Sequence, residues 1–130
     1  MSQSLVISGF YTSILAIIYI ALAFKVIGLR RENKIGIGEG GNADLAKAIR
    51  VHANFAEYVP IAILLLAIAE LNGTSSMLIH AFGGLLVTAR FLHAIGLSAS
   101  IGTTWQRLVG TLATFITILA LAVINIIAIF

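Results

Sequence analysis

Residues 44–71 read DLAKAIRVHANFAEYVPIAILLLAIAEL, so that a polar first half runs directly into an apolar second half. The run after Pro60 carries no charged residue until Glu70. A helix needs about 20 mostly apolar residues to cross the hydrocarbon core of a bilayer. This stretch therefore predicts a membrane-spanning helix that carries polar groups over part of its length.

The composition of the whole chain is that of an integral membrane protein. Its 130 residues are 60% hydrophobic and 10% charged, with a mean hydropathy of +1.08 and no cysteine. A soluble domain is about one quarter charged, and a disordered chain has a low hydrophobicity and a high charge. Both of these classes are excluded by the composition.

We predict an all-α fold, an integral membrane four-helix bundle in up-down order that forms one transmembrane domain over residues 1–130. The predicted helices cover about 5–29, 44–71, 77–96 and 105–130. A glycine-rich loop, an Asn-Gly turn and a short link join them, at residues 30–42, 72–76 and 97–104. Such segments are too long for the strands of a membrane barrel, which need about ten residues each.

The basic residues all fall toward the first and third connections of such a bundle. They are Lys25, Arg30, Arg31, Lys34, Lys47, Arg50, Arg90 and Arg107. Because loops rich in lysine and arginine stay on the cytoplasmic side, we expect these two loops in the cytoplasm and both termini outside. The net charge of +3 is thus explained by membrane topology, and no nucleic-acid partner is expected.

Polar side chains form a stripe on the second predicted span. Arg50, Asn54 and Glu57 are spaced i, i+4 and i+7, with Tyr58 beside them. Ionised groups in hydrocarbon cost several kcal/mol each, so the stripe cannot face lipid. We expect it to face other helices or a water-filled cavity.

More basic groups are expected at the same depth. Arg90 and His93 lie one turn apart in the third span. Arg107 opens the fourth span, while Arg30 and Arg31 close the first. Together with the stripe they set five arginines against a single carboxylate within the membrane. Such a cluster suits a small ligand that carries more than one anionic group.

Structural roles compete with this interpretation. An ion pair of Glu57 with Arg50 or Arg90 would fix the packing of helices and bind nothing. Glu70, at the other end of the second span, is expected to be solvated. His52 points away from Arg50 and is left out of the site. The scattered histidines are a weak metal signal, so no metal is expected.

Two further features bear on helix packing. Pro60 has no N–H, so it can bend the second helix, and it leaves the carbonyl of Ala56 without its usual donor. The fourth span carries small residues at helical spacing, which let membrane helices approach closely. These are Gly110, Ala113, Thr114 and Thr117.

The pattern Arg50-x-x-x-Asn54-x-x-Glu57-x-x-Pro60, in the second of four predicted helices, resembles the signature of the MAPEG superfamily, membrane-associated proteins in eicosanoid and glutathione metabolism. Length, number of spans and topology also fit, so the resemblance covers essentially the whole chain. Residues 48–60, with the glycine-rich loop before them, look most like the small bacterial branch that resembles microsomal glutathione transferases.

The resemblance implies a homotrimer that binds glutathione as a cosubstrate between subunits, in a bacterial inner membrane. By position, the glutathione-binding residues are Arg30, Arg50, Asn54, Glu57, Tyr58, Arg90 and His93. The implied catalytic residues are Arg107, which falls near an arginine that stabilises the thiolate, and Arg31 as its alternative. The family often has tyrosine where His93 stands. The partners would be a lipophilic electrophile or a lipid hydroperoxide dissolved in the bilayer.

Three functions stay open from the sequence. The first is a glutathione transferase, a peroxidase or both. The second is a non-catalytic protein of the same fold that binds lipid or acts as a scaffold. The third is a small multidrug exporter, which also has a membrane-embedded glutamate. That exporter class carries its glutamate in the first helix, where residues 5–29 have no acid, so it ranks last.

Overall fold

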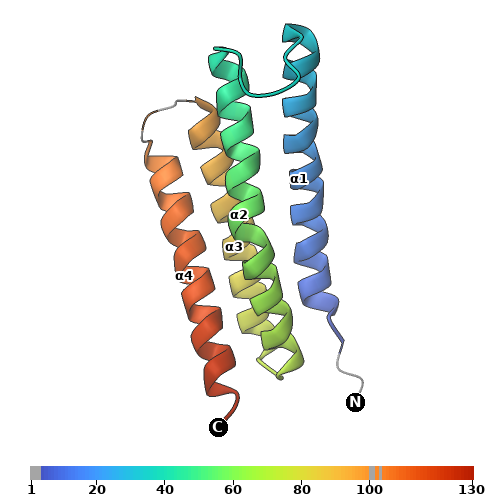
Figure 1. Cartoon of the computed structure of the whole chain (residues 1–130). Coiled ribbons are helices and arrows are strands. Elements are labelled where there is room, and N and C mark those ends of the chain that lie inside the picture. The colour runs from blue at the N-terminus through green and yellow to red at the C-terminus, as the bar shows by residue number, and fades with distance from the viewer. Residues whose placement is uncertain (1–3, 100–101, 103) are drawn as a thin grey trace.

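The computed structural model describes residues 4–99, 102 and 104–130 and folds them into four helices that run side by side (Figure 1). The helices are α1 (Val6–Asn33), α2 (Ala43–Leu71), α3 (Ser76–Ala99) and α4 (Trp105–Ile127). All four are long and apolar enough to cross a membrane. The predicted all-α bundle of four membrane-spanning helices is confirmed.

Local signals explain where the helices begin and end. Helix α1 runs past its predicted end at residue 29 to Asn33, and Lys34 ends it in a left-handed conformation with φ 54°. Helix α2 begins after Asn42, whose side-chain oxygen accepts a hydrogen bond from the Leu45 N–H at 2.9 Å. Thr104 caps α4 in the same way by accepting from the Arg107 N–H.

Helices α2 and α3 form the centre of the bundle. Helix α1 packs against both of them on one side, and α4 packs against both on the other (Figure 1). Within the described residues, α1 and α4 do not contact each other. Side chains on α1 and on α4 therefore lie on opposite sides of the molecule.

The two ends of the bundle differ in charge. The start of α1 and the end of α4 lie at one end, whereas the α1–α2 loop and the α3–α4 connection lie at the other (Figure 1). Every lysine and arginine lies in the part of its helix, or in the loop, nearest to this second end, which we call the basic end. That the basic end faces the cytoplasm stays a prediction of the positive-inside rule.

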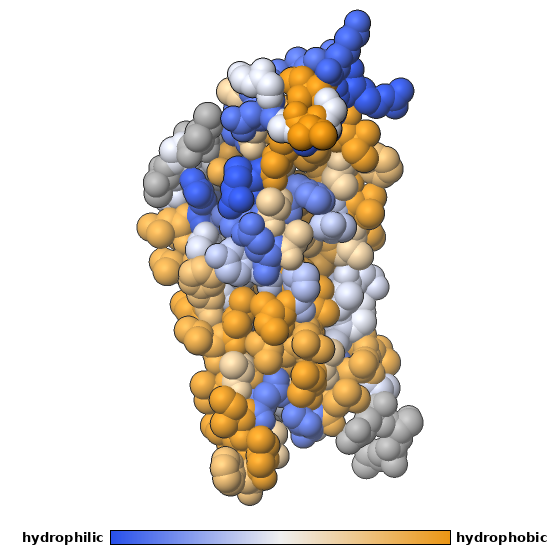
Figure 2. All heavy atoms as spheres, viewed as in Figure 1, coloured by the Kyte–Doolittle hydropathy of each residue, from blue (hydrophilic) through white to orange (hydrophobic). Residues whose placement is uncertain are grey.

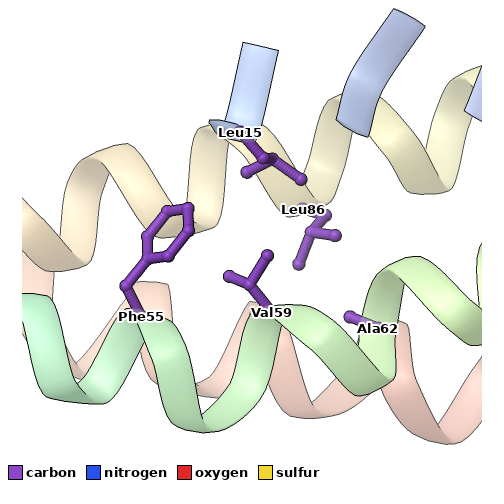
Figure 3. Packing of buried hydrophobic residues seen from close by; sticks show 5 residues of the cluster. All are labelled: Leu15, Phe55, Val59, Ala62 and Leu86. Carbon is purple, nitrogen blue, oxygen red and sulfur yellow. The ribbon is translucent and has the colours of Figure 1, made fainter. Parts of the chain in front are cut away.

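Two apolar clusters hold the helices together. The first joins α1, α2 and α3 and consists of Leu15, Phe55, Val59, Ala62 and Leu86 (Figure 3). The second lies further from the basic end and consists of Leu66, Ala69, Ile79 and Leu121. Lipid tails are as apolar as these side chains, so the clusters stabilise the bundle by close fit rather than by removal from water.

Helices α3 and α4 approach each other closely at Gly110. A Cβ atom placed there would lie 2.5 Å from the carbonyl oxygen of Ala89 and 2.8 Å from the backbone nitrogen of His93. One turn further on, Thr114 is fully buried and its hydroxyl donates to the Gly110 carbonyl at 2.7 Å. The expected close approach through the small residues of α4 is confirmed.

Glu70, which was predicted to be solvated, is partly exposed, and its carboxylate is bound to α1. Its carboxylate accepts hydrogen bonds from the backbone N–H groups of Ile7, at 3.0 Å, and Ser8, at 2.7 Å, and from the Ser8 hydroxyl. These amides belong to the first turn of α1, where the N-cap residue Leu5 offers no side-chain hydrogen bond. Glu70 of α2 thus caps α1, and its negative charge lies at the positive end of the α1 dipole.

Other polar contacts tie the same end of the bundle. The Tyr11 hydroxyl of α1 is 3.0 Å from Nδ1 of His80 on α3. The Asn125 amide of α4 donates to the Leu65 carbonyl of α2 at 2.9 Å and accepts from Asn72 at 3.2 Å. Together these contacts join all four helices at the end of the bundle opposite the basic end.

We predict that Gly110→Ala lowers the free energy of unfolding by about 1–3 kcal/mol, because the new methyl group overpacks the contact with Ala89. The control is Gly28→Ala on α1, where a methyl group would meet no atom within 4 Å. Both variants are compared with the parent chain by denaturant titration in detergent micelles. Equal stability of the two variants would contradict the close α3–α4 contact.

A second prediction concerns the capping of α1. Glu70→Ala removes three hydrogen bonds from the first turn of α1 and is expected to cost about 1–2 kcal/mol of stability. Hydrogen exchange should accelerate at the amides of Ile7 and Ser8. Glu39→Ala, in the exposed α1–α2 loop, is the control. Unchanged exchange in the Glu70 variant would rule out the cap.

Candidate binding site

The polar stripe of α2 lies on the face of the bundle that α2 and α4 share. The guanidinium Nη1 of Arg50 is 3.7 Å from Oε1 of Glu57, and their side chains are 56% and 52% exposed. Asn54 lies between them along the helix and is half-buried. Figure 2 shows hydrophilic side chains gathered toward the basic end of this face, with a hydrophobic surface next to them.

Arg90 of α3 supports the stripe from inside the bundle. It is 1% exposed, its Nη2 donates to Oδ1 of Asn54 at 2.6 Å, and its guanidinium carbon is 5.7 Å from the centre of the Phe55 ring. No acidic side chain pairs with it in the part of the chain that the structure describes, and its Nε has no hydrogen-bond partner there. The bundle therefore holds a buried positive charge that the protein's own described acids leave unbalanced.

His93 lies one turn further along α3, at the contact with α4. It is 1% exposed, and its Nδ1 has no hydrogen-bond partner among the described residues. Arg50, Arg90 and Arg107 are all near enough to act electrostatically on this imidazole. Guanidinium groups from α2, α3 and α4 are thus brought together around one position near the basic end.

An apolar groove continues from the polar stripe, between α2 and α4. Its volume is about 510 Å³. The residues that line it are Glu57, Tyr58, Ile61, Phe115, Ile118 and Leu119. The rings of Tyr58 and Phe115 meet edge to face, with their centres 5.2 Å apart. Glu57 belongs to both the stripe and the groove, so a polar ligand and an apolar ligand can lie next to each other here.

Arg30 and Arg31 lie elsewhere in the single chain. Nη1 of Arg30 donates to the carbonyl of Gly38 at 2.8 Å and to that of Ile35 at 3.4 Å, which holds the α1–α2 loop. Arg31 is exposed at the end of α1. Neither arginine is among the charged groups that act on His93 in the single chain, which are Arg50, Arg90 and Arg107. One chain therefore brings together three of the five expected arginines.

Some neighbours of the site carry no sequence signal. Phe115 is one apolar residue among many in α4, and only the fold places its ring against Tyr58. His52 was expected to point away from Arg50, and it faces α1, where its ring stacks on Tyr19 at 4.9 Å.

The depth of the stripe limits what can cover it. Glu57 lies at the middle of α2, which spans Ala43–Leu71, or about 21 Å from either end. The hydrocarbon core is about 30 Å thick, and ionised groups that face it cost several kcal/mol. A half-exposed pair of Arg50 and Glu57 at this depth requires water, a polar ligand or another protein surface over it.

Four spanning helices, with the polar stripe of Arg50, Asn54 and Glu57 on the second of them, define the class of this integral membrane protein. The chain belongs to the MAPEG family, whose model matches residues 8–127. It is 33% identical over 119 residues to the inner membrane protein YecN of Escherichia coli strain K12, an alignment that covers 92% of this chain and 89% of YecN. YecN of Escherichia coli O6:H1, strain CFT073, matches to the same extent.

We predict that Asn54→Leu costs about 2–3 kcal/mol of stability, because it removes the acceptor of the buried Arg90 guanidinium. The double variant Asn54→Leu with Arg90→Met should recover most of this loss, since no buried charge is then left without a partner. Asn33→Leu, at the exposed end of α1, is the control. Additive effects of the two substitutions, measured by denaturant titration, would contradict the coupling.

Proposed function

We propose that the chain is a glutathione-binding protein of a bacterial inner membrane and acts as a glutathione transferase, a peroxidase or both, on lipophilic substrates. The observation that carries this proposal is the polar stripe that is backed by the buried Arg90 and shares Glu57 with an apolar groove. Membership of the MAPEG family supports the activity, and the description of YecN as an inner membrane protein supports the location.

Glutathione is a tripeptide with two carboxylates, one ammonium group and one thiol. Arg50 would pair with a carboxylate, and Glu57 would accept from the ammonium group or a backbone amide. Because Arg90 occupies the oxygen of Asn54, the amide NH2 of Asn54 is left to donate to the ligand. Tyr58 would contribute its hydroxyl, and the buried Arg90 would supply positive potential from behind the stripe, with the Nδ1 atom of His93 near it as a further polar group.

Arg107 would promote ionisation of the bound thiol. A free thiol has a pKa of about 8.5, and a nearby guanidinium lowers that pKa by favouring the thiolate. The thiol proton leaves to solvent, and the sulfur forms a bond to the electrophilic carbon as its leaving group departs. With a lipid hydroperoxide, the thiolate attacks the peroxide oxygen and releases the alcohol, and a second glutathione then yields the disulfide and water. No metal is needed for either reaction.

The lipophilic substrate would occupy the α2–α4 groove. The groove offers about 510 Å³ beside Glu57, within the range of pockets for small organic ligands. A substrate dissolved in the bilayer would enter from the side and meet the thiolate at the edge of the stripe, so proximity supplies much of the rate enhancement.

A homotrimer would complete the site. Arg30 and Arg31 lie on α1, away from the cluster of their own chain, so they would reach the α2–α4 face of a neighbouring subunit. The same contact would cover the half-exposed pair of Arg50 and Glu57, which cannot face lipid without cost. In this assembly Arg31 is the alternative to Arg107 for the thiolate. The basic end would face the cytoplasm, with both termini outside.

The proposal predicts separate effects of two arginines. Arg50→Gln should weaken glutathione binding at least tenfold, measured by titration calorimetry on detergent-solubilised protein, because a charge-assisted hydrogen bond is lost. Arg107→Gln should leave binding within about threefold but reduce both the ultraviolet absorbance of the bound thiolate and the turnover of a generic electrophile. Lys25→Gln, an exposed basic residue of α1 outside the site, is the control.

Each alternative has its own outcome. Glutathione binding without thiolate or turnover would replace the enzyme by a non-catalytic binding protein. Absence of glutathione binding in the parent chain would favour the lipid-binding or scaffold role. Unchanged binding and turnover in both arginine variants would refute the residue assignments.

A further inference from the structure

The turn of α4 that carries Arg107 packs directly against a glycine of α3. A Cβ atom placed on Gly96 would lie 2.6 Å from the backbone nitrogen of Arg107 and 2.6 Å from Oγ1 of Thr104. Cβ atoms in proteins essentially never approach other atoms so closely, and a backbone nitrogen cannot swing aside as the end of a long side chain can. The contact therefore requires glycine at position 96.

The Thr104 hydroxyl that faces Gly96 is the cap of α4. It accepts a hydrogen bond from the N–H of Arg107 at 3.3 Å, and the Thr104 carbonyl accepts from the N–H of Leu108 at 3.0 Å. An N-cap of this kind fixes the backbone of the first helical turn. A side chain at position 96 would press on the hydrogen bond that holds the backbone of Arg107.

Gly110 makes the reciprocal contact one turn further along α4. A Cβ atom placed there would lie 2.8 Å from the backbone nitrogen of His93, which lies one turn before Gly96 on α3. Helices α3 and α4 run side by side in opposite directions (Figure 1), so each of the two glycines receives the backbone of the other helix. These two contacts hold Arg107 near His93, on which its charge acts.

The first turn of a helix is an unfavourable place for an arginine. The positive end of the helix dipole lies there and disfavours a cation, and the first turn of α4 contains no acid to offset it. A local conflict of this kind is expected at a functional site. An anion near this turn gains from both the guanidinium and the helix dipole.

We propose that Gly96 is a positioning residue for Arg107, and that its contact with the Thr104 cap sets how strongly a bound thiol is ionised. The inference rests on the proposed function, in which Arg107 stabilises the thiolate of glutathione. Gly96 has no side chain with which to bind the ligand. It acts by letting the first turn of α4 lie against α3.

The test follows the ultraviolet absorbance of the glutathione thiolate as a function of pH, with detergent-solubilised protein. In Gly96→Ala the guanidinium of Arg107 is displaced and the thiolate loses part of its stabilisation, so the pKa of the bound thiol rises. We expect the midpoint to move up by about 0.5–1 pH unit, which reduces the thiolate at neutral pH about threefold to tenfold. Glutathione binding should stay within about threefold of the parent.

Two pairs of variants separate positioning from stability. Gly83→Ala, further along α3, would place a methyl group in the ring of Tyr11 and should lower stability without moving the midpoint. Thr104→Val removes the cap of α4 and should raise the midpoint, whereas Thr104→Ser keeps the hydroxyl and should match the parent. The Thr104 variants leave Gly96 in place, so they test the same point without overpacking the helix contact.

Two further measurements show whether the effect passes through Arg107. In an Arg107→Gln background, Gly96→Ala should cause no further shift of the midpoint, because the group that it displaces is absent. Hydrogen exchange at the Arg107 amide should accelerate in both Gly96→Ala and Thr104→Val, with or without glutathione.

Each contrary result has its own meaning. A parent midpoint in Gly96→Ala and Thr104→Val, in a protein whose parent forms thiolate, would refute the positioning role and leave the proposed function intact. An equal shift in Gly83→Ala would reduce the effect to a loss of stability. A further shift in the Arg107→Gln background would show that Gly96 acts by another route. A parent chain that forms no thiolate would refute the proposed function itself, and the role of Gly96 in ionisation with it.

Discussion

A positive charge inside the bundle must be held, because the bilayer offers neither water nor counter-ions at that depth. The hydrogen bond from Arg90 to Asn54 meets this constraint by joining α3 to α2, and the ring of Phe55 lies beside the guanidinium. The same bond orients the amide of Asn54 within the polar stripe. The hydrogen bond between Arg90 and Asn54 therefore affects both the packing of the bundle and the chemistry of its surface. The unbalanced charge of Arg90 favours an anionic ligand on the outer face of α2.

Helix α2 lines two grooves, one between α2 and α4 and one between α2 and α1. Its side toward α4 carries the charged pair of Arg50 and Glu57, whereas its side toward α1 lines an apolar groove of about 340 Å³. The two sides thus offer different chemistry, ionic on one and neutral on the other.

Composition and periodicity were sufficient to predict the four spans. The small residues around Gly110 were sufficient to predict the close approach of α4, because both features follow from local sequence pattern. Depth in the membrane could also be read from position along each helix. The direction in which a helix faces could not be predicted from position along the helix. This is why the sequence did not show that Arg30 lies on the far side of the bundle from α4. The contact of Glu70 with Ser8 joins residues 62 apart, and spacing in the sequence carries no trace of it.

The cap of α1 by Glu70 also bears on biosynthesis. The ribosome makes α1 first, so its opening amides are synthesised before their acceptor. Glu70 is the last residue but one of α2, and the acceptor therefore arrives only when the second span is complete. Insertion of the two helices as a hairpin would bring the amides and the carboxylate to the same membrane surface together. The hydrogen bonds between Glu70 and the first turn of α1 would then form once the helices have left the translocon.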